Sequence, residues 1–198
     1  MGYSEILDSE CKKLSLNPPV EQREKLAAYC TELERWNQKT NLTSLSGVEL
    51  VRRLVVEPVW IGAELGISGV LADIGSGNGA PAIPLASTRS LIEAHLVESR
   101  LKRAAFLRHL KAKLELTNVS VHHNRFEDIA SELKPLDWIT LQAVALSPSM
   151  LALLREAATP TTKVVWITAR AESPVPSSTM LRVPGSETVA WVFSVDHS

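Results

Sequence analysis

Apolar side chains recur at helical spacing in the first sixty-six residues. A proline pair, Pro18-Pro19, suits the start of a helix there, and a shorter helix is expected before it. A further helix is expected over residues 50–65, where Pro58 should kink or split it because proline lacks an amide N–H. Four positions between charged residues carry the main helical pattern: Leu26, Tyr29, Leu33 and Trp36.

From residue 70 the pattern changes to short apolar runs that alternate with helical stretches. This alternation predicts a parallel sheet covered by helices on both faces. Two later apolar runs flank a Pro184-Gly185-Ser186 turn and predict an antiparallel hairpin at the edge of the sheet. The expected strands are residues 70–74, 94–97, 119–122, 138–141, 163–168, 180–183 and 188–195. The chain is therefore expected to be an α/β protein, with a helical N-terminal extension at residues 1–66 and one compact unit at residues 67–198.

The composition excludes several classes of protein and is consistent with the expected α/β fold. The chain has 198 residues, of which 45% are hydrophobic and 22% are charged. Such a composition supports one sizeable core and excludes a disordered, collagen-like or disulfide-framework chain. The 21 basic and 22 acidic residues give a formal charge of -1, so any contact with RNA is expected to be local.

Targeting and redox signals indicate a cytoplasmic protein. No apolar run reaches the roughly 20 residues that a membrane helix needs, so no membrane partner is expected. Three early acids, Glu5, Asp8 and Glu10, stand where a signal peptide would be basic and then apolar. Cys11 and Cys30 are expected to remain reduced, as half-buried thiols on neighbouring helices.

The segment with the clearest chemistry is a strand that runs into Gly75, Gly77 and Gly79 and then into a helix. Glycines at such a turn permit positive φ and let a ligand approach the backbone, while a helix N-terminus offers free N–H donors. The same glycines also fit a dinucleotide site, or a turn that only packs a helix on its strand. Asp73 precedes them, and a carboxylate there favours a cationic amino-acid moiety such as that of S-adenosylmethionine over a pyrophosphate.

Acidic and polar residues also follow the next two strands. Glu98 ends the second strand, twenty-five residues after Asp73, where an acid can accept both ribose hydroxyl protons. It would equally favour the N-terminus of the next helix. The third strand leads into residues 124–128, where an adenine ring would sit. A helix start with acids in its first turn explains that segment equally well.

A basic run occupies the helix expected after Glu98. Six basic residues precede the first acid at Glu115, beside a buried stripe of Phe106, Leu107, Leu110 and Leu114. Such a run could contact phosphates, or could form an ordinary solvated face. No metal site is expected, because His122-His123 lacks cysteine or acidic partners, and no hydrolase elbow is present.

Several stretches between residues 25 and 170 together resemble the glucose-inhibited division protein B family, the bacterial guanine-N7 methyltransferases of 16S ribosomal RNA. The resemblance implies a Rossmann-like, class I methyltransferase fold with a seven-stranded, mostly parallel sheet. It also implies S-adenosylmethionine as methyl donor and 16S rRNA or the small ribosomal subunit as partner. The stretches are Trp36-Asn37, Asn41-Leu42-Thr43, the loop at 73–84 with its Pro81-Ala82-Ile83-Pro84 tail, Glu98-Ser99, Lys102-Arg103 and Phe106-Leu107.

The resemblance also implies roles for single residues. The methionine end of the donor would contact the glycine loop, the ribose would contact Glu98, and the adenine would lie beside Arg125-Phe126-Glu127. The full set of expected donor-binding residues is Asp73, Gly75, Ser76, Gly77, Gly79, Glu98, Ser99, Arg125, Phe126 and Glu127.

Departures from the family pattern fall on the acceptor side. Gln142, in the stretch Leu141-Gln142-Ala143-Val144, stands where the family has an arginine, and it is expected to position the acceptor. Residues 52–57 lack the family histidine and aspartate, and Thr168-Ala169-Arg170 replaces a Lys-Gly pair. These changes leave open a donor-binding homologue with lost or redirected activity. That homologue would methylate another RNA or a small molecule, or act as a non-catalytic regulator. A nicotinamide-dependent oxidoreductase is disfavoured by Asp73 and by the prolines after the glycine loop.

Overall fold

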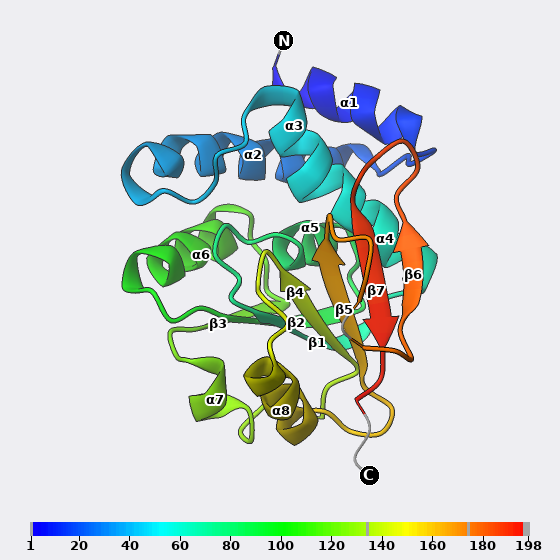
Figure 1. The fold of residues 1–198 in the computed structure, drawn as a ribbon. Coiled ribbons are helices and arrows are strands. Elements are labelled where there is room, and N and C mark those ends of the chain that lie inside the picture. The colour runs from blue at the N-terminus through cyan, green and yellow to red at the C-terminus, as the bar shows by residue number, and fades with distance from the viewer. Residues whose placement is uncertain (1, 134, 174, 196–198) are drawn as a thin grey trace.

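A seven-stranded sheet forms the middle layer of the molecule (Figure 1). The computed structural model describes residues 2–133, 135–173 and 175–195. The strands lie in the order β3-β2-β1-β4-β5-β7-β6. Only β7 runs antiparallel to its two neighbours, which confirms the predicted parallel sheet with a hairpin at one edge. The strands are β1 Gly69–Ile74, β2 Ile92–Val97, β3 Val119–His122, β4 Trp138–Gln142, β5 Lys163–Thr168, β6 Thr179–Arg182 and β7 Val189–Phe193.

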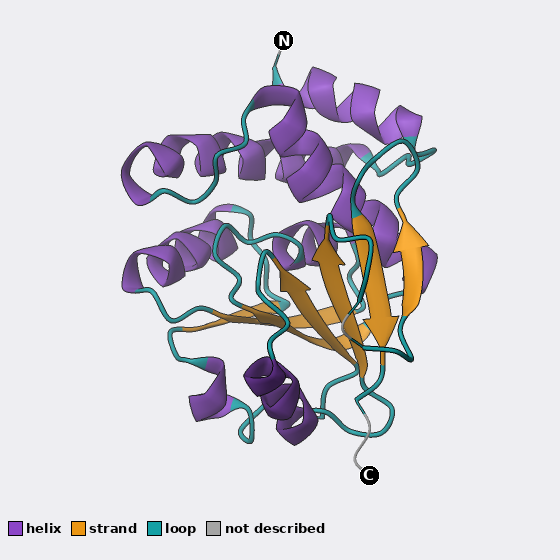
Figure 2. Ribbon diagram, viewed as in Figure 1, coloured by secondary structure: helices purple, strands orange, loops and turns teal. Residues whose placement is uncertain are grey.

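Helices cover both faces of the sheet (Figure 2). The N-terminal helices lie on one side together with α5 and α6, whereas α7 and α8 lie on the other side. The helices are α1 Tyr3–Lys13, α2 Val20–Thr40, α3 Gly47–Val51, α4 Glu57–Leu65, α5 Ala82–Thr88, α6 Leu101–Lys113, α7 Phe126–Ile129 and α8 Pro148–Ala157. The expected early helices and the helix with the basic run are thus confirmed.

The helical backbone is continuous through residues 47–65, so Pro58 does not split it, but the hydrogen-bonding pattern changes just before the proline. A π-helical segment, η1 Arg52–Val56, links α3 to α4, and Pro58 lies in the first turn of α4. Pro58 has no N–H to donate to the preceding turn, and the change from π-helical to α-helical bonding lies next to it. Glu57, at the junction, is almost completely buried, and its Oε1 accepts a 2.6 Å hydrogen bond from Ser186 Oγ in the hairpin turn.

Two hydrophobic clusters form the core, one on each face of the sheet. Alternation along β1 places Leu71 in the first cluster and both Ala72 and Ile74 in the second. The first cluster also takes in the buried face of α2, so the N-terminal helices share their core with the sheet. Cys11 and Cys30 lie in this cluster as free thiols. Both are buried, whereas half-buried thiols were expected.

The register of the strands brings the chemically interesting residues to one edge. Asp73 of β1 lies opposite Leu96 of β2 and Thr140 of β4, and the three strands are parallel. The segments that follow β1, β2 and β4 therefore meet at the same end of the sheet, where ligands of open α/β sheets bind.

Candidate functional site

A cleft of about 820 Å³ opens at the carboxyl ends of the parallel strands. One wall comes from the segments that follow β1, β2, β4 and β5. The opposite wall comes from the N-terminal extension, through residues 42–45 and the η1 residues Arg53 and Leu54. Five of the expected site residues line this cleft: Gly75, Ser76, Gly77, Glu98 and Gln142.

The glycine loop needs glycine for two separate reasons. Gly75, Gly77 and Gly79 have φ values of 70°, 47° and 94°, a region that side chains disfavour. A Cβ on Gly75 would also lie 3.0 Å from Val144 Cγ2, and one on Gly79 would lie 2.9 Å from Ile83 Cγ1. The loop therefore turns tightly while Gly75 and Gly77 present their backbone to the cleft. Gly79 packs beneath it against α5.

Glu98 holds the loop and the next helix with one carboxylate. Its Oε2 accepts a 3.0 Å hydrogen bond from Gly77 N, and its Oε1 accepts a 2.7 Å bond from Arg100 N. Arg100 is the N-cap residue of α6, so Glu98 also stabilises the start of that helix. This contact agrees with the expectation that Glu98 favours the N-terminus of the next helix. The carboxylate is almost completely buried among protein atoms and still borders the cleft.

Asp73 lies behind the loop and does not line the cleft. Its Oδ1 accepts a 2.7 Å hydrogen bond from Thr140 Oγ1, and no described residue donates to its Oδ2. Burial raises the pKa of Asp73 to about 7, although the Thr140 hydrogen bond acts in the opposite direction. Ser76 ties the loop to this strand, since its hydroxyl donates to the Asp73 carbonyl at 2.8 Å.

The expected adenine-side residues do not line the cleft. Arg125 is the N-cap residue of α7, and an exposed ion pair joins its Nη1 to Glu127 Oε1 at 3.5 Å. Phe126 points into the second hydrophobic cluster. Ser99, also outside the cleft lining, accepts a hydrogen bond on its carbonyl from His123 Nε2 at 3.1 Å. The geometry at 125–127 is that of a helix start, at the same edge of the sheet as the glycine loop.

Gln142 contacts the N-terminal extension across the cleft. Its Nε2 donates a long, 3.4 Å hydrogen bond to the Arg53 carbonyl of the π-helical segment. Its Oε1 is buried and has no hydrogen-bond partner among the described residues. Ala143 follows with φ 57°, and the Val144 carbonyl accepts a 3.0 Å bond from Trp166 Nε1. The segment after β4 is thus fixed from both sides.

The N-terminal extension supplies the opposite wall of the cleft, and the sequence carries one signal for it. The Asn37 side chain shapes it: Oδ1 accepts hydrogen bonds from Leu42 N at 2.7 Å and Thr43 N at 2.9 Å, and Nδ2 donates to the Thr43 carbonyl at 2.8 Å. The Asn41-Leu42-Thr43 motif was the available signal. Asn41 itself ends α2 in a left-handed conformation, and its carbonyl accepts a 3.2 Å bond from Arg103.

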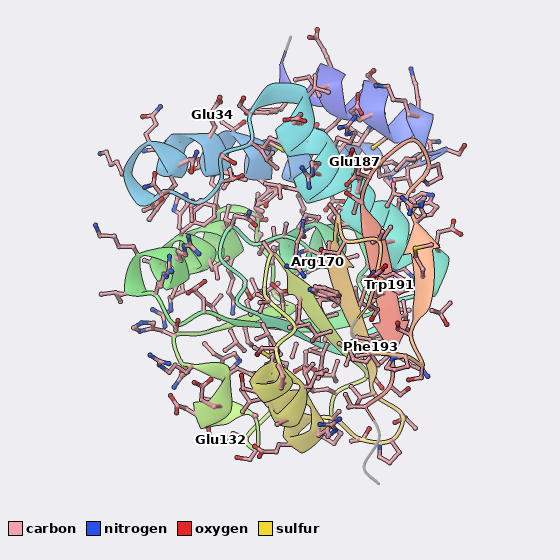
Figure 3. All side chains as sticks on the ribbon, viewed as in Figure 1. Glu34, Glu132, Arg170, Glu187, Trp191 and Phe193 are labelled. Atoms are coloured by element: carbon pink, nitrogen blue, oxygen red, sulfur yellow. The ribbon has the colours of Figure 1, made fainter. Side chains whose placement is uncertain are left out.

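The charge of the cleft lining is strongly asymmetric. Four arginines, Arg53, Arg100, Arg103 and Arg170, face one acid, Glu98. Arg170 follows the end of β5, and Figure 3 labels it near that end of the strand. The remaining basic residues of α6 lie outside the cleft lining. A polyanion would find complementary charge at this opening.

No group of three or more His, Cys, Asp and Glu side chains could hold a metal ion in the described ranges. Among the helices of the same residues, none is long and apolar enough to cross a membrane.

Comparisons with known proteins identify the family to which this chain belongs. The chain is 31% identical over 159 residues to a ribosomal RNA small subunit methyltransferase G of Clostridium botulinum, covering 79% of this chain and 66% of that protein. It is 35% identical over 144 residues to the protein of the same name from Desulfitobacterium hafniense, covering 71% and 60%. The chain therefore spans a little under two thirds of the length of these relatives.

A solved structure shares the fold. A methyltransferase from Geobacter sulfurreducens superposes with a TM-score of 0.63 over 85% of this chain and 89% of that chain, at 12% identity. At this identity the likeness supports the architecture alone. The model of the family described as rRNA small subunit methyltransferase G matches residues 22–174. This match confirms the resemblance seen in the sequence motifs, and the chain belongs to the rRNA small subunit methyltransferase G family.

Proposed function

We propose that this protein transfers the methyl group of S-adenosylmethionine to N7 of a guanine in 16S ribosomal RNA. The observation that carries the proposal is the cleft itself, where a glycine loop braced by Glu98 faces an opening lined by four arginines. Family membership supports the reaction. A cytoplasmic location follows from the proposed acceptor.

The donor side has features that suit S-adenosylmethionine. Gly75 and Gly77 carry no side chain of their own and line the cleft with their backbone. Glu98 borders the cleft, where its carboxylate would accept from ribose hydroxyls, and Asp73 Oδ2, to which no described residue donates, is a buried carboxyl oxygen behind the loop. We assign Ser76, Gly79 and Ser99 to the shaping of this pocket and Arg125-Phe126-Glu127 to its adenine side. When bound, the donor supplies a sulfonium methyl group.

The acceptor side needs to position a base rather than to remove a proton. Guanine N7 carries an in-plane lone pair in the neutral base, so no general base is required. The absence of a histidine or cysteine from the cleft lining fits this chemistry. Alignment of two bound reactants can lower a barrier by about 7–11 kcal/mol in favourable cases. The arginines would hold phosphates around the target, and Gln142 lies where it could contact a base edge.

One observation favours a second candidate, a donor-binding homologue without transfer to rRNA. Gln142 is already engaged with the Arg53 carbonyl, where the family pattern has a charged arginine. A neutral amide cannot form the charged, forked contact that an arginine makes with phosphate or guanine. Donor binding without turnover would identify this alternative.

Methyl transfer tests the proposal directly. The purified protein is incubated with labelled S-adenosylmethionine and unmodified small ribosomal subunits, and labelled nucleosides are identified by mass spectrometry. We expect 7-methylguanosine at one site of 16S rRNA. A Gly75→Val variant is the matched negative control, because its side chain would clash with Val144 and fill the loop's open face. No label, with a transferring family enzyme run beside it, would overturn the proposal in favour of the second candidate.

A further inference from the structure

A tyrosine of the N-terminal extension reaches the donor loop. Tyr29 lies in the middle of α2 with its side chain completely buried. Its hydroxyl donates a 3.0 Å hydrogen bond to the Asn78 carbonyl, forty-nine residues further along the chain. Asn78 lies between Gly77 and Gly79 and lines the cleft. The contact thus joins a helix outside the sheet domain to the segment that would hold the donor.

The loop around Asn78 needs external support. Both flanking glycines adopt positive φ, and glycine loses more conformational freedom on ordering than other residues. Hydrogen bonds within the loop run from Gly79 N to the Ser76 carbonyl at 2.6 Å and from Ala80 N to Asn78 Oδ1 at 3.0 Å. Glu98 holds Gly77 N from one side. On the other side Tyr29 holds the Asn78 carbonyl.

The packing of the Tyr29 ring does not require its hydroxyl. A phenylalanine would fill the same core space, since the ring packs in the first hydrophobic cluster. The hydroxyl instead brings a polar group into a fully buried position, which is costly unless it is hydrogen-bonded. Burial raises the pKa of Tyr29 well above 10, so the group keeps its proton and remains a donor at any working pH.

We infer that Tyr29 is a positioning residue for the methyl donor. By holding the Asn78 carbonyl, it keeps the Gly77-Asn78-Gly79 backbone in the conformation that receives the donor, and it makes α2 a part of the donor site. The inference rests on the proposed function for the identity of the ligand. Its structural half, the bracing of the loop, concerns this chain alone.

A matched pair of variants tests the inference. Tyr29→Phe removes the bracing hydroxyl, and Tyr3→Phe removes the hydroxyl of the other tyrosine, which lies on α1 in the same helical layer. Calorimetry with S-adenosylmethionine and with S-adenosylhomocysteine should show Kd values five- to tenfold higher for Tyr29→Phe, and within twofold of the original protein for Tyr3→Phe. The reason is that a loop populating its binding conformation only in part weakens apparent affinity by that fraction.

Two further readouts separate positioning from simple packing. Hydrogen exchange without ligand should be faster in peptides covering residues 75–80 in Tyr29→Phe and unchanged there in Tyr3→Phe. In methyl transfer, KM for the donor should rise while kcat at saturating donor stays within twofold, because saturation selects the ordered loop. Should Tyr29→Phe fail to fold, Tyr29→Met, which also lacks the hydroxyl, takes its place with the same expectations.

Distinct outcomes count against the inference and against the proposed function. A Tyr29→Phe protein that loses thermal stability but binds donor within twofold of the original, with unchanged exchange at 75–80, would make Tyr29 a core residue only. If the original protein binds no S-adenosylmethionine, the proposed function fails. The exchange comparison then still decides whether Tyr29 braces the loop.

Discussion

Thr140 donates a 2.7 Å hydrogen bond to the buried carboxylate of Asp73, from the neighbouring strand β4 to the end of β1. Both side chains are almost completely removed from solvent. The hydroxyl satisfies one carboxylate oxygen, while no described residue donates to the other. A carboxyl in this position is poised between its charged and neutral forms near neutral pH, because burial favours the neutral form and the hydrogen bond favours the charged one.

The first prediction concerns stability and pH. The pKa of Asp73 is about 7 in the folded protein, against 3.8 for an ordinary aspartate. Between these values the folded state keeps a proton that the unfolded state has lost, so the free energy of unfolding should fall as pH rises from about 4 to about 7. The slope from this one group is at most about 1.4 kcal/mol per pH unit. Urea unfolding at several pH values should show a smaller fall in Asp73→Asn, whose amide does not titrate. An identical pH dependence in both proteins would contradict this assignment.

The second prediction removes the hydrogen bond itself. Thr140→Val keeps the shape of the side chain but removes the hydroxyl that donates to Asp73 Oδ1. The pKa of Asp73 should rise further, so less carboxylate should be charged at pH 7 and S-adenosylmethionine should bind about tenfold more weakly. The loss should shrink at higher pH, where the carboxyl ionises again. Calorimetry across pH 6–9 measures both effects.

Thr140→Ser is the matched control for that experiment, because serine retains the hydroxyl in nearly the same place. Its donor affinity should stay within twofold of the original. A uniform loss in Thr140→Val at every pH would point to disturbed packing instead of a changed carboxyl charge.

Sequence pattern predicted the sheet well because the relevant signals are local. Five parallel strands alternate with helices, and their apolar runs are long enough to identify them within one or two residues. The glycine loop after β1 is equally local, since positive φ at Gly75, Gly77 and Gly79 requires glycine wherever the chain lies. Strand order then brings Glu98 to the loop by geometry.

The far wall of the cleft could not be read from the sequence in the same way. Whether Arg53 or Leu42 faces the cleft depends on how the N-terminal helices pack across the sheet, and that packing joins residues far apart in the chain. The π-helical turn before Pro58 decides which side chains of residues 52–56 point inward. Helical periodicity assumes a regular helix there, so it carries no signal for this turn.

The third prediction addresses the arginines of the cleft. If they contact RNA phosphates, Arg53→Gln, Arg100→Gln and Arg170→Gln should each lower affinity for 16S rRNA and reduce the slope of log K against log salt by about 1. Donor affinity should remain within twofold in all three. Lys12→Gln removes one charge from α1, outside the cleft lining, and should leave the salt slope unchanged. Equal slopes in all four variants would place the RNA elsewhere on the molecule.

The last prediction concerns the role of Gln142 in methyl transfer. Gln142→Arg should raise the rate of methyl transfer severalfold without altering donor affinity, because a charged, forked side chain holds a phosphate or guanine O6 better than an amide does. Loss of the weak, 3.4 Å bond to the Arg53 carbonyl should cost little, since that bond is long. Gln142→Ala separates the two effects, because it removes the bond without adding charge. A transfer rate that is the same in Gln142→Arg and the original protein would remove Gln142 from the acceptor site. It would leave the side chain the structural role of tying the end of β4 to the π-helical segment.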